Sequence, residues 1–144
     1  MTLEEMESYR KNVHMLKKVR DMKRRMLDAA YPGGNGADGS RAAVSDKTGK
    51  IGAELGDLDT EIKAMQMAVD REKKKVEDFI GKCGNAWKRQ LIRMRFCRAM
   101  KWQEIAAVVG GGNSAEGVRA IVMREVKRLV ENGTETAENG GKKT

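Results

Sequence analysis

The chain has 144 residues, of which 35% are charged and only 4% are aromatic, and its net charge is +8. This balance favours long solvated helices over one large core, so we expect one compact domain or a small domain joined to an extended helical part. Neither an apolar run of about 18 residues nor a signal-peptide pattern occurs, which predicts a soluble intracellular protein with no membrane partner. Cys83 and Cys97 form no CxxC pair and lie far from the single histidine, so we expect reduced thiols and no zinc finger.

The first predicted helix covers residues 3–30. Its apolar residues recur at steps of three and four, as in an amphipathic helix. This stripe consists of Met6, Tyr9, Val13, Leu16, Leu27 and Ala30. Residues 31–45 follow as a flexible connector, because they hold the only proline of the chain and four glycines.

A second helix is expected after a cap at Ser45 or Asp46, and its apolar residues alternate steps of four and three as far as Phe79. Residues 1–81 are therefore predicted to form a long helical hairpin, or to pair as a coiled coil with another copy of the chain. The first helix also has a second apolar edge, which predicts a homo-oligomer through this helical region. That edge consists of Met15, Val19, Met22 and Met26.

Residues 82–130 carry 11 Lys and Arg residues against 3 acids, so the whole basic excess of the chain lies there. Such a segment suits a polyanion, because each phosphate that Lys or Arg neutralises releases a condensed counterion. An acidic protein surface and a membrane surface are alternative partners for a basic domain.

Three helices are predicted within this basic segment, over residues 86–98, over residues 102–109, and from Asn113 or Ser114 to about Val130. The glycines at 110–112 supply the positive φ angles that a tight turn needs. Glu116 stands three residues after Asn113, as in a capping box. The side chains expected to face inward from the first two helices are Trp87, Leu91, Met94, Trp102, Ile105, Ala106 and Val109.

The spacing of small residues indicates a helix-turn-helix. This motif has a small residue where its two helices cross and a glycine four residues later, and Ala106 and Gly110 satisfy both requirements. Val118 and Ile121 fill the expected apolar positions of the next helix if the turn is longer than the shortest form. The predicted fold class is all-α, with the N-terminal hairpin or coiled coil followed by a three-helix helix-turn-helix domain over residues 82–130.

A DNA-contacting face is predicted on the last of these helices, because the second helix of the motif enters the major groove. Arg119 is the candidate for base reading, since a guanidinium bonds guanine O6 and N7 together. Glu116 is expected either to accept a hydrogen bond from cytosine or to cap the helix. Gly117 either allows the backbone to approach DNA closely or weakens the start of the helix. Ala120 and Met123 share the face, and the expected phosphate contacts are Ser114, Arg124, Lys127, Lys101 and Gln103.

Three segments carry a family resemblance: Leu91 to Phe96, Met100 to Ala106, and Val118 with Arg119. They resemble the region-four DNA-binding domain of bacterial sigma factors, and more closely the small sigma-like regulators of phages and prophages of the RinA and ArpU type. The resemblance implies transcriptional control by binding double-stranded DNA in the bacterial cytoplasm, with RNA polymerase as a further partner. Two features depart from it: Lys101 replaces the usual Ser or Thr cap, and the turn from Gly110 to Asn113 is longer.

Other classes of function are weighed against this one. Phage small terminase subunits also combine a helix-turn-helix with oligomerisation helices, although their DNA-binding domain usually comes first. A helical adaptor that binds a protein through the hairpin is a third class. No catalytic, cofactor-binding or metal-binding set of residues is recognisable, so we expect no enzyme, no cofactor and no metal. Residues 131–144 are predicted to be a disordered tail.

Overall fold

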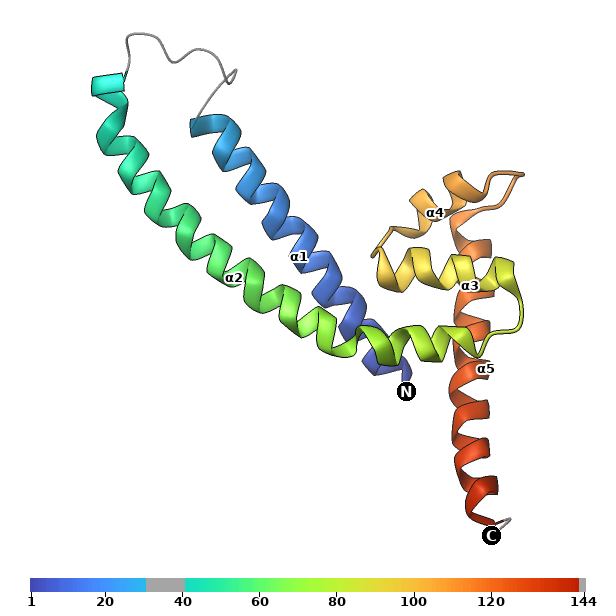
Figure 1. Ribbon diagram of the computed structural model, residues 1–144. Helices are drawn as coiled ribbons and strands as arrows, with labels where there is room; N and C mark the ends of the chain where they lie inside the picture. The colour runs from blue at the N-terminus through green and yellow to red at the C-terminus, as the bar shows by residue number, and fades with distance from the viewer. Residues whose placement is uncertain (31–40, 143–144) are drawn as a thin grey trace. The chain divides into compact units, whose positions relative to one another are not determined.

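The computed structural model describes the backbone of residues 1–30 and 41–142, and the side chains of residues 1–30 and 50–133. Within these ranges the chain is all-helical and contains no strand, which confirms the predicted fold class (Figure 1). The elements are α1 (Leu3–Ala30), α2 (Arg41–Gly81), α3 (Ala86–Ile92), the π-helix η1 (Arg93–Cys97), α4 (Trp102–Val109) and α5 (Ala115–Lys142).

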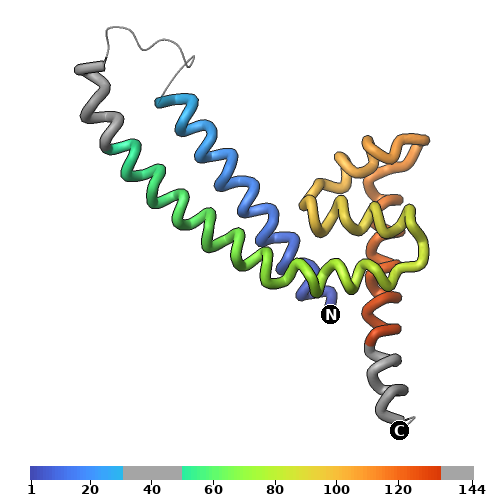
Figure 2. The backbone as a smooth tube through the Cα atoms, in the orientation of Figure 1, coloured from blue at the N-terminus to red at the C-terminus, as the bar shows by residue number. Residues whose placement is uncertain are grey.

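The chain forms two compact units. One comprises Met1–His14 together with Val69–Thr144, and the other comprises Met15–Ala68. The unit that contains the helix-turn-helix therefore also includes the beginning of α1 and the end of α2, whereas the sequence places the start of that domain at residue 82. Figure 2 traces the helices of both units as a tube.

The first unit has a continuous apolar core. The Lys75 ammonium donates to the Glu5 carboxylate over 2.6 Å, and this bond links the start of α1 to the end of α2. Below this surface contact the helices bury their apolar stripes, and burial of this kind is the main stabilising contribution to a small fold. The fully buried side chains of this unit include Met6, Val76, Ile80, Leu91, Ile92, Phe96, Ile105, Val118, Val122 and Val126.

The helix predicted over residues 86–98 is α-helical only as far as Ile92. It begins at Asn85, whose side chain accepts from the Lys88 backbone N–H over 3.0 Å. It then widens into η1, where the Arg98 N–H donates to the Arg93 carbonyl over 3.0 Å. Ala99 follows with a φ of 53°, a left-handed conformation that reverses the chain. The inward orientation predicted for Trp87 is wrong, because this side chain is 47% exposed.

The turn between α4 and α5 agrees with the prediction. Ile105 and Ala106 are buried on α4, and the Gly110 N–H donates to the Ala106 carbonyl over 2.9 Å. The three glycines have φ angles of 66°, 63° and 78°, which only glycine adopts readily. α5 then packs on α3 and α4 and continues to Lys142, beyond the end predicted near Val130. Residues 131–142 are helical, where the sequence predicts a disordered tail.

The second unit contains the remaining parts of α1 and α2, which run antiparallel (Figure 1). The ammonium of Lys23 pairs with Asp59, and the guanidinium of Arg20 donates to Gln66. α2 begins at Arg41, before the expected cap at Ser45 or Asp46, because alanine-rich residues precede that cap and alanine is the strongest helix former. The part of the predicted connector over residues 31–40 lies outside the described residues.

Candidate nucleic-acid interface

Of the two residues predicted to cap α5, Asn113 and Ser114, the structure has Ser114 at the cap. The Ser114 hydroxyl accepts from the Gly117 backbone N–H over 3.0 Å, so Ser114 is the cap. Asn113 instead stabilises the turn, because its side-chain amide donates to the Gly110 carbonyl over 2.8 Å. The capping box predicted between Asn113 and Glu116 is therefore wrong, and Glu116 keeps an exposed carboxylate.

The structure explains why position 117 is a glycine, in addition to any role at DNA. A Cβ added at this position would lie 3.1 Å from the Ser114 hydroxyl oxygen, which is closer than most such contacts in proteins. The absence of a side chain therefore leaves room for the cap. The first turn of α5 consequently has an open surface that another molecule can approach closely.

The residues predicted to contact DNA on α5 share one side of that helix and are accessible. Arg119, Ala120, Arg124 and Lys127 are exposed, and Met123 is half-buried. The opposite side of the helix buries its valines and Leu129 against the rest of the unit. This arrangement is the amphipathic pattern of a helix that packs on one side and is free to bind on the other.

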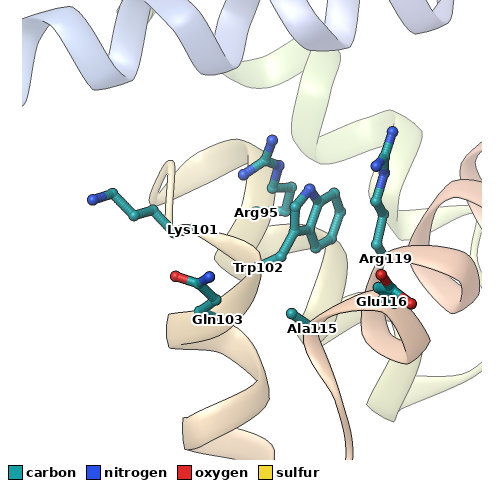
Figure 3. Close-up of a pocket in the computed structure, with 7 residues that line it drawn as sticks. All are labelled: Arg95, Lys101, Trp102, Gln103, Ala115, Glu116 and Arg119. Atoms are coloured by element: carbon teal, nitrogen blue, oxygen red, sulfur yellow. The ribbon is translucent and has the colours of Figure 1, made fainter.

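The beginnings of α4 and α5 enclose a shallow open pocket of about 340 Å³ (Figure 3). Three predicted site residues from α4 and α5 contribute to it, namely Gln103, Glu116 and Arg119, together with Lys101 at the cap of α4. In Figure 3 the Trp102 indole lies between the Arg95 and Arg119 side chains, while the Lys101 side chain points away from it. The pocket is lined by Arg95, Lys101, Trp102, Gln103, Ala115, Glu116 and Arg119.

Arg95 is a site residue that the sequence did not indicate. Its guanidinium carbon lies 4.2 Å from the centre of the Trp102 ring, which is a cation–π contact. One terminal nitrogen of Arg95 donates to the Met100 carbonyl over 2.9 Å, whereas its buried Nε has no partner in the described part of the chain. Burial is the largest cause that lowers the pKa of Arg95, and the positive charge of Arg119 adds to this effect.

η1 and Ala99 explain why the side chains of Arg95 and Trp102 meet. The π-helical turn and the left-handed residue fold the chain back, so that Lys101 and Trp102 return beside Arg95. This reversal is a tertiary feature. The only signal in the sequence is the basic character of residues 93–98, which does not distinguish Arg95 from its neighbours.

α4 begins without the cap that a Ser or Thr would give. The Lys101 side chain has no acceptor atom, and the Glu104 carboxylate instead accepts from the Lys101 backbone N–H over 3.2 Å. The Lys101 ammonium therefore stays available at the edge of the pocket. Glu104 stabilises the helix start in its place.

Some of the basic residues in this unit are already neutralised. The buried Glu125 carboxylate accepts from the Nε of Arg128 over 3.1 Å, lies 3.6 Å from the Lys88 ammonium, and accepts from the Cys83 thiol over 3.4 Å. The hydrogen bond from Arg128 is the main reason that the pKa of Glu125 is lowered. In the same way Arg93 pairs with Glu77 over 3.3 Å. These three cations stabilise the fold.

The cations of the predicted interface are not neutralised by carboxylates in this way. Lys101, Arg119, Arg124 and Lys127 have no carboxylate partner within the residues that the structure describes. Glu116 is the one carboxylate among the side chains that line the pocket. The surface at the start of α4 and along α5 is therefore positively charged without internal compensation, which suits an anionic partner.

Other kinds of site find little support in the described residues. They contain no group of three His, Cys, Asp or Glu side chains that would hold a metal ion, and both cysteines are free. Burial raises the pKa of the Cys97 thiol to about 11, so this thiol stays protonated at neutral pH and is a poor nucleophile. None of the described helices is apolar over a length that would span a membrane.

Comparisons with known proteins leave the family open. No protein-family model, no curated protein and no solved structure matches this chain.

Proposed function

We propose that this protein binds double-stranded DNA in a sequence-specific manner through α5, and that it regulates transcription of phage or prophage genes. The observation that carries the proposal is the set of uncompensated cations on and beside α5, whereas Lys88, Arg93 and Arg128 of the same unit are paired with carboxylates. α5 follows a short helix and a tight glycine turn, as the recognition helix of a helix-turn-helix does.

In this proposal the side chains have different tasks. Arg119 and Glu116 stand nearest the start of α5 and read base edges in the major groove. Lys101, Gln103, Ser114, Arg124 and Lys127 bind phosphates, which fixes the register without reading sequence. Gly117 lets the backbone of α5 approach the DNA closely, and the small Ala120 and the flexible Met123 allow contact with the groove wall.

The regulatory part of the proposal comes from the resemblance to region four of sigma factors and to the RinA and ArpU type of activator. RNA polymerase is the second partner that this resemblance suggests. We further propose that the protein acts as a homo-oligomer in the cytoplasm of the bacterial host, and that the helical region brings the copies together.

Binding to duplex DNA at a series of salt concentrations tests the first part. A duplex selected from fragmented genomic DNA and a random duplex of equal length serve as probes. If the three cations Lys101, Arg124 and Lys127 contact phosphates, log affinity falls with log salt concentration with a slope of about −2.7, that is about −0.9 for each phosphate. Lys74→Ala removes an exposed cation of α2 and should leave the slope unchanged. A salt-independent affinity contradicts the proposal.

A transcription reporter tests the regulatory part. A promoter that contains the selected sequence is expected to respond to the protein in a bacterial host, and Arg119→Ala should abolish the response. Specific binding without any effect on transcription would instead favour recognition of a DNA packaging site.

A further inference from the structure

Within residues 15–30 and 50–68, the second unit has almost no buried core of its own. Within residues 15–30 and 50–68, Leu16 is the only apolar side chain that is buried. The residues that form the stripe of α2, from Ile51 to Met65, are all only half-buried. In the first unit the same two helices bury Met6 and Val76 completely. Two helices alone leave their apolar stripes open to water, and a second pair of helices would close them.

α1 carries an apolar surface that its own hairpin does not cover. This surface, called the methionine edge below, consists of Met15, Val19, Met22 and Met26. Met15 is 50% exposed and Met22 is 54% exposed, while Val19 and Met26 are half-buried beside them. The four residues recur at steps of four, three and four, so they form a continuous line along the helix. Such a line on a surface helix is typical of packing against another helix.

The two helices of this unit carry opposite charge. Residues 15–30 contain six Lys and Arg residues against two acids, whereas residues 50–68 contain two Lys residues against four acids. Lys18 and Arg25 flank the methionine edge, and neither has a carboxylate partner in the described chain. The acids Glu54, Asp57 and Glu61 form a line on α2, called the acidic edge, and they also have no ion-pair partner there.

The methionine edge and the acidic edge lie on the same side of the hairpin. Both helices are wound at 100° per residue, and each edge flanks the inward-facing stripe in the same rotational sense. In an antiparallel pair of helices, such equivalent flanks face the same side. Ala64 and Ala68 share the flank of the acidic edge, and their small side chains leave room for long ones opposite.

We propose that a second copy of this chain covers this side and completes a four-helix bundle. The charges select the arrangement of the copies. If α1 lay on the partner's α1, two strongly basic helices would be adjacent. If α1 lies on the partner's α2, Lys18 and Arg25 face the acidic edge and the methionine edge packs over the alanines. A two-fold axis parallel to the helices produces this pairing.

The arrangement has a consequence that rests on the proposed DNA binding. Each chain enters the bundle at residue 15 and leaves it at residue 68. With the axis parallel to the helices, these points lie at the same end of the bundle in both copies. Both helix-turn-helix units are then joined to that end, so a two-fold dimer would bind an inverted repeat in DNA. The dimer itself does not depend on DNA binding, and its test uses no DNA.

Sedimentation of the full-length protein at tens of micromolar tests the dimer. The expected mass is twice the chain mass of 16.0 kDa. The double variant Met15→Lys and Met22→Lys should sediment as a monomer, with its helix content unchanged by circular dichroism. Met67→Lys is the matched control, because Met67 is 62% exposed but lies on another side of α2, and this variant should remain a dimer. A monomeric wild type, a larger oligomer, or equal dissociation of both variants would overturn the proposal.

Engineered cysteines test which helices meet. A mixture of Met22→Cys protein and Ala64→Cys protein is expected to give a disulfide-linked dimer of the two variants under mild oxidation, at several times the yield of either variant alone. Wild-type protein, whose Cys83 and Cys97 are both free, is the background control. If Met22→Cys protein cross-links to itself more efficiently than to its partner variant, α1 faces α1 and the proposed arrangement is wrong.

Discussion

The guanidinium of Arg95 lies 4.2 Å from the centre of the Trp102 ring, so η1 and α4 are joined at the pocket between the two helix starts. This contact orients a charged group whose terminal nitrogen also binds the Met100 carbonyl. Arg95 from η1 and Arg119 from α5 then line one pocket. The candidate interface is therefore assembled from three segments and not from α5 alone.

Replacing the aromatic ring tests the importance of this contact. Trp102→Leu removes the cation–π contact, which is worth about 0.5 to 1 kcal/mol at a partly exposed site, and leaves Arg95 free to move. We expect affinity for selected and random duplexes to fall about 2-fold to 5-fold in fluorescence anisotropy. Trp87→Leu is the matched control, because Trp87 is also partly exposed but does not line the pocket, and it should not change affinity. Equal losses from both variants would contradict a role for the pocket.

Two cations of α5 should differ in what they contribute to DNA binding. Arg119→Ala removes the guanidinium that we propose reads base edges, so the preference for the selected duplex over a random one should decrease by about 1 to 3 kcal/mol. Lys127→Ala removes a phosphate contact, so both duplexes should bind more weakly and the salt slope should decrease by about 1. Titrations of both variants on both duplexes measure this difference. The assignment fails if the two substitutions have the same effect on selected and random DNA.

The buried Glu125 should make stability depend on acidity. Its pKa is lowered in the folded protein, mainly by the bond from Arg128, so its ionised form stabilises the fold above the unfolded value of about 4.3. That contribution is lost as the pH falls through the lower pKa of the folded state. Glu125→Gln should cost about 1 to 3 kcal/mol at neutral pH, with a smaller difference from wild type in acid, measured by urea unfolding.

Glu5 provides the comparison for this measurement. The pKa of Glu5 is also lowered, by its hydrogen bond from Lys75, but this pair lies on the surface. Glu5→Gln should therefore change stability much less than Glu125→Gln, because surface ion pairs contribute little. A larger effect at Glu5 would show that the buried cluster around Glu125 is not a principal stabilising contact.

Replacing Ala99, the left-handed residue before α4, with glycine should stabilise the fold. Ala99 has a φ of 53°, a conformation that costs a residue with a Cβ roughly 1 kcal/mol relative to glycine. Ala99→Gly should accordingly raise the free energy of unfolding by up to about 1 kcal/mol. Ala107→Gly, at an exposed position inside α4, should lower it by about 0.5 to 1 kcal/mol. Thermal or urea unfolding of both variants measures the difference, and a destabilising Ala99→Gly would rule out strain at this position.

Features that depend on local chemistry could be predicted from the amino-acid sequence. α4 begins and ends where the spacing of Ile105 and Ala106 and the glycine run predicted, because positive φ angles at 110–112 require glycine. Most residues of the apolar stripes predicted for the long helices are buried or half-buried in the structure, although Leu27 is 37% exposed. For the same reason the exposed side of α5, with Arg119 and Lys127, could be located from helical periodicity alone.

Contacts between segments that lie far apart in the sequence could be identified only from the folded structure. Periodicity cannot show that Met6 and Val76 complete the core of the unit that holds the helix-turn-helix, because contacts between distant segments leave no mark in local spacing. Nor could it separate Arg128, which neutralises a buried carboxylate, from Lys127, which has no such partner. The position of Arg95 over Trp102 depends on a π-helical turn and a strained alanine, which local propensity does not favour. Packing of the whole unit overrides local preference at these places, and they are the places where the candidate interface is built.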